Sequence, residues 1–230
     1  MAQRDGENGT ALSKPHGRFT MKIFENTHYG WKDSKPTCAH EYLLPAVTKH
    51  IQDLSLGKSV KILDIGCGNG YIASKLAELG HFLIAVDVSP DGIDIARSEY
   101  PNVNFKVCSV YDEKLADVVG ELVDCVISLE VVEHLLYPKR LFEQSYRILK
   151  KGGYLIISTP YHGYLKNLAF SIVNGWDRHF KVEWDGGHIK FFSKRTLTRM
   201  VCDVGFKNPC FYGVGRLPWL WKSMIMVVEK

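Results

Sequence analysis

Several features that define other classes of protein are missing from this 230-residue chain. It has no apolar run long enough to span a bilayer, and its polar first residues lack the apolar segment of a signal peptide. It also has no dense block of lysine or arginine, and its net charge is only +4. We therefore expect a cytoplasmic protein of ordinary globular composition, with no nucleic acid among its partners.

The chain has six cysteines, but none of them forms the C-x-x-C pattern that is typical of zinc and redox sites. We therefore expect reduced structural thiols rather than disulfides or a zinc site. Only Cys67 lies within a recognisable motif, where its backbone is expected to matter more than its sulfur.

The beginning of the chain differs in composition from the rest. Residues 1–20 are poor in apolar side chains and rich in polar ones, so we expect a disordered tail. Residues 21–57 follow as an arm of mixed aromatic and polar residues and then a helix, from about Tyr42 to Leu54, that contains Pro45. The remaining residues, 58–230, are expected to form the main domain.

From Val60 onward, short apolar runs alternate with helical patterns. Because these runs are almost continuously apolar, we expect strands of a parallel sheet that helices cover on both faces. The last two strands have no helix between them and should pair antiparallel. The sequence thus predicts an α/β fold: a doubly wound, seven-stranded, mostly parallel sheet whose last strand is antiparallel. The expected strands are 60–65, 82–89, 103–110, 123–130, 153–160, 209–215 and 224–230; the expected helices include 70–79, one that ends at Lys150 to Gly153, and one from Ser193 to near Gly205.

The stretch VKILDIGCGNG, residues 60–70, is the most informative part of the sequence. A strand runs into Asp64, and glycines follow at Gly66, Gly68 and Gly70 before a helix begins. Such a turn presents bare backbone N–H groups and a helix N-terminus to a ligand. An acidic side chain directly before the glycines favours a ligand that carries a cationic group.

Two common nucleotide-binding patterns do not fit this stretch. The dinucleotide fingerprint G-x-G-x-x-G needs a third glycine or alanine where this chain has Tyr71, and Asp64 would repel a pyrophosphate. A phosphate-binding P-loop would need Gly-Lys-Ser/Thr after the turn, which this chain does not have. The actual spacing, D-x-G-x-G-x-G, therefore argues against a dinucleotide and for a ligand with a positive charge.

This pattern, with the order of the elements around it, resembles the class I S-adenosylmethionine-dependent methyltransferases over about residues 38–230. The resemblance implies that S-adenosyl-L-methionine is the cofactor and that Asp64 lies near its methionine ammonium group. It also implies that Asp87 accepts hydrogen bonds from both ribose hydroxyls and that the Leu129 carbonyl accepts one from the methionine amine. The cofactor-binding residues implied in this way are Asp64, Gly66, Cys67, Gly68, Asn69, Gly70, Asp87, Val88, Val110, Tyr111, Asp112, Leu129 and His134.

Residues 128–135, SLEVVEHL, resemble the corresponding segment of small-molecule methyltransferases that include the ubiquinone-biosynthesis O-methyltransferases. The chain lacks the Asn/Asp-Pro-Pro-Tyr/Phe/Trp signature of enzymes that methylate nucleic-acid bases or glutamine. Some relatives in the ubiquinone group bind a divalent metal through residues that match Glu130, Glu133 and His134. We expect instead that Glu133 and His134 start a turn that helps to fix the cofactor pocket, without a metal.

A long insertion, residues 161–192, follows the fifth expected strand, at the end of the sheet where such folds bind ligands. It is rich in aromatic residues and histidine, so we expect a lid over a ring-bearing or amphipathic acceptor. Its apolar residues recur at helical spacing, which we attribute to core packing. The alternative is a pocket cover or a peripheral membrane contact, which the LPWLW segment at 217–221 would assist. The residues at helical spacing are Tyr161, Tyr164, Leu165, Leu168, Ile172 and Trp176.

Two histidines of this insertion are candidate catalytic bases. His188 follows two glycines that let the backbone approach a ligand, and His162 comes just after the fifth expected strand. We therefore predict a methyltransferase that acts on a hydroxyl of a small molecule, such as a phenol, a quinol or a sugar-like compound. The alternatives are a small-molecule N-methyltransferase and a non-catalytic S-adenosylmethionine-binding regulatory module.

Overall fold

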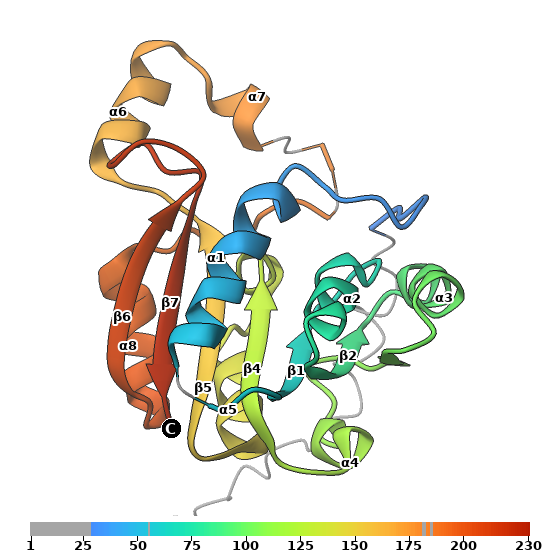
Figure 1. The fold of residues 1–230 in the computed structure, drawn as a ribbon. Coiled ribbons are helices and arrows are strands. Elements are labelled where there is room, and N and C mark those ends of the chain that lie inside the picture. Colours follow the sequence, from blue (N-terminus) through green and yellow to red (C-terminus); the bar gives the residue numbers. More distant parts are fainter. Residues whose placement is uncertain (1–28, 55, 181–182, 185) are drawn as a thin grey trace, which may run out of the picture.

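The computed structural model describes residues 29–54, 56–180, 183–184 and 186–230 and has a seven-stranded sheet at its centre (Figure 1). The strand order is β3-β2-β1-β4-β5-β7-β6. β7 pairs antiparallel with both β5 and β6, whereas β1 to β5 pair in parallel. The predicted doubly wound sheet with an antiparallel last strand is therefore confirmed. The strands are β1 Lys61–Ile65, β2 Phe82–Asp87, β3 Asn104–Val107, β4 Val123–Leu129, β5 Leu149–Pro160, β6 Lys207–Val214 and β7 Ser223–Glu229.

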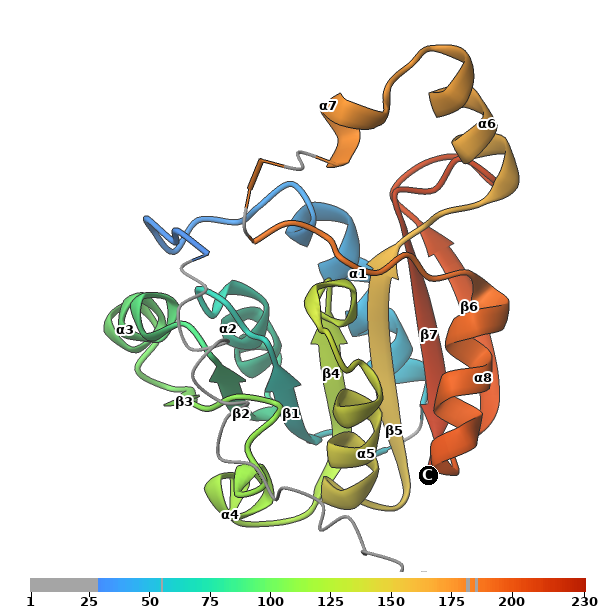
Figure 2. The same cartoon turned by 180° about the vertical axis from the view of Figure 1, so that it is seen from behind.

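Helices cover both faces of the sheet, as predicted (Figures 1 and 2). One apolar core joins α1, α2 and α3 to the sheet, and a second core joins α4, α5 and α8 to its other face. Among the described residues, no helix is long and apolar enough to cross a membrane. The helices on the two faces are α1 His40–Asp53, α2 Tyr71–Glu78, α3 Pro90–Glu99, α4 Leu115–Val119, α5 Lys139–Ile148 and α8 Lys194–Val204.

The predicted limits of α8 are confirmed by its capping groups. The Ser193 hydroxyl accepts a hydrogen bond from the Thr196 N–H, and the Thr196 hydroxyl accepts one from the Ser193 N–H in return. At the other end, Gly205 adopts the left-handed conformation that closes the helix.

The beginning of β5 departs from the prediction. We expected Lys150 to Gly153 to end a helix, but α5 ends at Ile148 and this segment forms an irregular start of β5. The Lys150 ammonium donates to Asp124 over 2.6 Å, and the Gly152 N–H donates to the Lys230 carbonyl over 3.1 Å. Cross-strand partners therefore override the local pattern of basic residues and glycine that is typical of a helix end.

Two further elements differ from the prediction, and two predicted segments lie outside the described residues. β3 ends at Val107, so the residues from 108 to 110 lie in the loop that follows it, and the short helix α4 was not predicted. The predicted disordered tail, residues 1–20, and the first residues of the arm lie outside the described residues.

The insertion contains two helices, α6 Tyr164–Ile172 and α7 Trp176–Phe180, which lie beyond the carboxyl ends of the parallel strands (Figure 1). Core packing was the wrong explanation for the apolar residues of α6 itself, whereas Tyr161, just before α6, does pack against the core. Tyr164 is 78% exposed and Ile172 is 74% exposed, whereas the buried residue of α6 is Lys166. The apolar side of α6 thus faces outward, and a lysine faces inward.

Gly70 makes the tight turn from β1 into α2 possible. Its φ of 79° lies in the left-handed region, and a Cβ there would stand 2.7 Å from both the Ala96 Cβ and the Phe105 ring. A side chain at this position would therefore be strained and would also collide with the packing of α3 and β3 on the glycine turn.

We predict that Gly70→Ala lowers the free energy of unfolding by about 2–4 kcal/mol, because backbone strain and overpacking add at this position. The measurement is urea denaturation followed by circular dichroism. Gly80→Ala is the matched control, since Gly80 has a φ of 92° but no atom within 4 Å of an added Cβ. Equal losses in the two variants would contradict the packing part of this explanation.

Candidate active site

A cavity of about 390 Å³ opens where the carboxyl ends of β1, β2 and β4 meet the glycine turn. Ligands of doubly wound sheets bind at this end of the strands. The glycine turn and the residues that follow β2, β3 and β4 contribute to its lining. Most of the residues predicted to bind the cofactor line it: Asp64, Gly66, Cys67, Gly68, Asp87, Val88, Val110, Tyr111, Leu129 and His134.

Three predicted cofactor residues, Asn69, Gly70 and Asp112, lie outside this lining. The Asn69 side-chain amide donates to the carbonyls of Asp33 and Lys35 over 3.0 and 2.9 Å, so this residue holds the arm against the glycine turn. Gly70 is required by packing, as described above. The Asp112 carboxylate accepts a hydrogen bond from the backbone N–H two residues further on, within the turn after β3.

Two buried carboxylates dominate the electrostatics of the cavity. Asp64 is only 2% exposed, and burial together with the nearby Asp87 raises its pKa from 3.8 to about 8. Burial also raises the pKa of Asp87, which three backbone N–H groups partly oppose. A cation bound in this cavity would stabilise the ionised form of both carboxylates.

Asp87 connects the ends of two neighbouring strands. Its Oδ2 accepts a hydrogen bond of 2.8 Å from the Gly68 N–H, and its Oδ1 accepts one of 2.8 Å from the Ser89 N–H. The carboxylate that closes β2 therefore fixes the position of the glycine turn after β1. The carboxylate keeps lone-pair capacity with which it could accept a hydrogen bond from a ligand hydroxyl.

The arm covers the glycine turn (Figure 1). A Cβ on Gly68 would lie 2.3 Å from the Trp31 ring, so the turn must be glycine for the arm to pack closely. Tyr29 and His40 line the same cavity. Our sequence reasoning missed these residues as part of the site, and the aromatic content of the arm was the one signal that could have indicated them.

Glu130 follows β4 in a strained conformation, with a φ of 54°. Its Oε1 accepts a hydrogen bond of 2.7 Å from the Ser158 hydroxyl, and its Oε2 accepts one of 3.1 Å from the Ser223 hydroxyl. Burial raises its pKa to about 7, and these two hydroxyls and the charge of Lys166 oppose the rise. β5 and its neighbour β7 thus each supply a hydroxyl that holds the carboxylate after β4 at a fixed place.

A second cavity, of about 470 Å³, lies between α1, α6 and the connection of β6 to β7. Glu130 and His188 line both this cavity and the first one. Ligands in the two cavities would therefore meet at Glu130 and His188. His162 lies elsewhere: its ring packs against Phe180 and Phe191, and it lines neither cavity.

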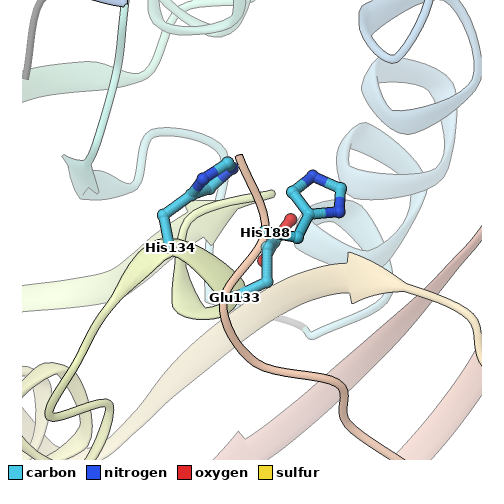
Figure 3. Close-up of side chains that lie close together, drawn as sticks. All are labelled: Glu133, His134 and His188. Carbon is cyan, nitrogen blue, oxygen red and sulfur yellow. The ribbon is translucent and has the colours of Figure 1, made fainter. Parts of the chain in front are cut away.

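Among the described residues, Glu133, His134 and His188 place one potential metal-binding atom each within 4.8 Å of one another (Figure 3). Figure 3 shows Glu133 and His134 on the segment after β4 and His188 on the neighbouring loop. Glu133 is 0% exposed and neither of its carboxylate oxygens has a hydrogen bond of normal geometry, while burial raises its pKa well above the usual range.

These three side chains fit a divalent cation, because a buried carboxylate and two imidazoles are suitable ligands. A metal bound there would polarise an acceptor oxygen at the junction of the two cavities. The set differs from the one implied by the resemblance, since the Glu130 oxygens are already bound by two serine hydroxyls.

Comparisons with known proteins agree with this geometry. Residues 39–210 match the family described as "Methyltransferase domain". The ubiquinone biosynthesis O-methyltransferase of Azorhizobium caulinodans is 31% identical over 157 residues, which are 65% of this chain and 60% of that protein. A Mycobacterium tuberculosis protein named "Probable S-adenosylmethionine-dependent methyltransferase" is 30% identical over 159 residues, 69% of this chain and 53% of its own length.

The fold also recurs among solved structures. A protein from Pyrococcus horikoshii OT3 has a TM-score of 0.66 at 19% identity and covers 90% of this chain and 98% of its own. The chain spans little more than half of the length of the two sequence relatives above. The family match includes the glycine turn and the acidic ends of β1 and β2, and the chain therefore belongs to the methyltransferase domain family, among the class I S-adenosylmethionine-dependent methyltransferases.

Proposed function

We propose that this protein transfers the methyl group of S-adenosylmethionine to a hydroxyl of a small molecule, such as a phenol, a quinol or a sugar. The observation that carries this proposal is the pair of adjoining cavities that share Glu130 and His188. One cavity has the carboxylates that suit a cationic methyl donor, and the other leaves room for an acceptor. The similarity to ubiquinone O-methyltransferases supports oxygen as the methylated atom.

The donor would lie along the carboxyl ends of the strands. Asp64 would face the methionine ammonium group, Asp87 would accept hydrogen bonds from the ribose hydroxyls, and the Leu129 carbonyl would accept one from the methionine amine. Val110 and Tyr111 would line the adenine. This orientation brings the sulfonium methyl group towards the second cavity.

The reaction is an in-line displacement. The acceptor oxygen forms a bond to the methyl carbon while the carbon–sulfur bond breaks, and its electron pair leaves on the neutral sulfur of S-adenosylhomocysteine. Holding the two reactants in line supplies roughly 7–11 kcal/mol of the barrier reduction. His188 would accept the hydroxyl proton, since it lies at the junction of the two cavities.

The alternatives make different demands on the site. A small-molecule amine would use the same donor geometry and would need less help from a base. A regulatory module without catalysis would not need a second cavity that reaches the donor. Exposed apolar residues on α6 and in the β6–β7 connection, among them Tyr164, Ile172, Leu217 and Trp219, favour an amphipathic acceptor and a peripheral membrane contact. A cytoplasmic location stays a prediction.

We expect the affinity for S-adenosylhomocysteine to rise between about pH 6 and pH 7.5, by up to about ten-fold per pH unit. The pKa of Asp64 is raised to about 8, so the free protein is largely protonated there in this range. The ligand ammonium favours the ionised carboxylate, so binding releases a proton. The affinity therefore rises as the pH rises. Isothermal titration calorimetry at several pH values measures both the affinity and the proton release.

Asp64→Asn is the matched control for this pH dependence, because it keeps the size of the side chain and removes its ionisation. We expect weaker binding and a smaller pH slope in this variant. An unchanged slope would assign the proton to a different group, such as Asp87.

The main test of the proposed function is methyl transfer from radiolabelled S-adenosylmethionine to a panel of phenols, quinols and sugars, with and without a chelator. With the acceptor so identified, we expect His188→Ala to lower turnover by roughly 10²–10⁴ while S-adenosylhomocysteine binding is retained. His162→Ala should have the smaller effect, because His162 lines neither cavity.

Two outcomes would change these roles. Unchanged turnover in His188→Ala would remove this residue as the base. Loss of activity with the chelator, restored by added Mn²⁺ or Zn²⁺, would reassign His188 as a ligand in the cluster with Glu133 and His134.

A further inference from the structure

The second cavity has an unusual balance of charge. Its lining includes three cationic side chains, Lys166, Arg216 and Lys222, and one carboxylate, that of Glu130. Glu130 is bound by the hydroxyls of two serines and not by any of the three cations. The cavity that is left for the acceptor is therefore positively charged.

Lys166 is the most unusual of the three cations, because it is buried and forms no salt bridge in the described part of the chain. It is only 8% exposed, and its ammonium donates to the Tyr161 and Lys222 carbonyls over 2.8 and 3.4 Å. No carboxylate forms a salt bridge with it among the described residues. Burial and the charge of Arg216 lower its pKa to about 8, and the charge of Glu130 opposes part of this fall. A lysine is rarely buried without a salt bridge to a carboxylate, because desolvation of the ammonium is costly, and here Glu130 acts on Lys166 only from beyond salt-bridge distance.

The orientation of α6 is also unusual for a helix on a protein surface. A helix on a protein surface normally buries its apolar side chains and leaves lysine in water. Here Tyr164 and Leu165 are exposed while the neighbouring Lys166 faces the cavity. The packing of the insertion thus presents an ammonium group to the cavity instead of an apolar residue.

The other two cations come from the connection between β6 and β7. The Lys222 ammonium lies 5.1 Å from the centre of the Tyr42 ring, and Arg216 is exposed at the rim, close enough to Lys166 to lower its pKa. Segments about 50 residues apart in the sequence therefore bring three positive charges to one cavity. Like charges repel, and the one carboxylate of the lining, Glu130, offsets only part of this repulsion, so an added anion would make the arrangement more favourable.

The lining also has an apolar part. Pro160, Phe170 and Val173 provide walls against which a ring or an aliphatic chain can pack. A further hollow of about 340 Å³ shares Lys166, Phe170 and Arg216 with this cavity. A ligand that fits these walls has an apolar body and an acidic group.

We propose that the second cavity binds a methyl acceptor that carries an acidic group, a carboxylate or a phosphate, held by Lys166, Arg216 and Lys222. The apolar body of the acceptor packs against Phe170 and Val173, and its hydroxyl reaches His188. This inference rests on the proposed function and specifies the class of substrate for the same site.

The test uses three probes of nearly equal size: 4-hydroxybenzoate, 4-hydroxyphenyl phosphate and the neutral 4-hydroxybenzamide. Each is titrated calorimetrically into the full-length protein saturated with S-adenosylhomocysteine. We expect at least one acidic probe to bind about ten-fold more tightly than the amide, because charge-assisted hydrogen bonds are stronger than neutral ones. Which of the two acids binds more tightly shows whether the cavity prefers a carboxylate or a phosphate.

Arg216→Gln should reduce this preference to about three-fold or less, because it removes a charge-assisted contact without disturbing a buried group. Lys166→Gln should do the same and serves as a second variant. Arg199→Gln is the matched control, since Arg199 is an exposed arginine of α8 that lines neither cavity. The affinity for S-adenosylhomocysteine should be the same in all three variants.

Equal binding of the acids and the amide, no binding of any probe, or a preference that survives both Arg216→Gln and Lys166→Gln would overturn this inference. So would sedimentation with phosphatidylglycerol vesicles that depends on Arg216 while the small acids show no preference, because the cations would then serve a lipid surface. Failure of the wild-type protein to bind S-adenosylhomocysteine would instead contradict the proposed function itself.

Discussion

The hydrogen bond from the Gly68 N–H to the Asp87 carboxylate fixes the geometry on which the rest of the site depends. It joins the turn after β1 to the end of β2, so that two acidic strand ends lie beside the same cavity. Trp31 can cover the turn only because Gly68 has no side chain. Asn69 then ties the arm to the turn through two carbonyls, and one short segment thereby shapes the floor and the cover of the cavity.

The fold and most of the donor cavity could be predicted from the sequence because their signals are local. A buried parallel strand is recognisable from its own residues, and the position of Asp64 before the glycines follows from the chain order alone. The exceptions occur where partners distant in sequence decide the outcome. The first residues of β5 have a composition that is typical of the end of a helix. They form a strand instead because they hydrogen-bond to Asp124 and to the Lys230 carbonyl.

The acceptor side could not be predicted in the same way. The spacing of Tyr164 and Ile172 shows that a helix forms, but not which of its sides faces the protein. Lys166, Arg216 and Lys222 have no common motif, and they form a cluster only because α6 packs beside the connection of β6 to β7. Glu130 joins Ser158 to Ser223 for the same reason: strand order makes β7 the neighbour of β5.

Acidic side chains predominate in the first cavity and basic side chains in the second, and this contrast has consequences for selectivity. In the proposed reaction the cationic methyl donor would favour the ionised forms of Asp64 and Asp87 and would be repelled by the lysines and arginine of the second cavity, whereas the proposed acidic acceptor would meet the reverse pattern. Like charges would therefore weaken the binding of each reactant in the cavity of the other. Selectivity would arise from repulsion in the wrong cavity as much as from attraction in the right one. His188 lines both cavities, so the residue proposed as the base lies where the proposed donor and acceptor would meet.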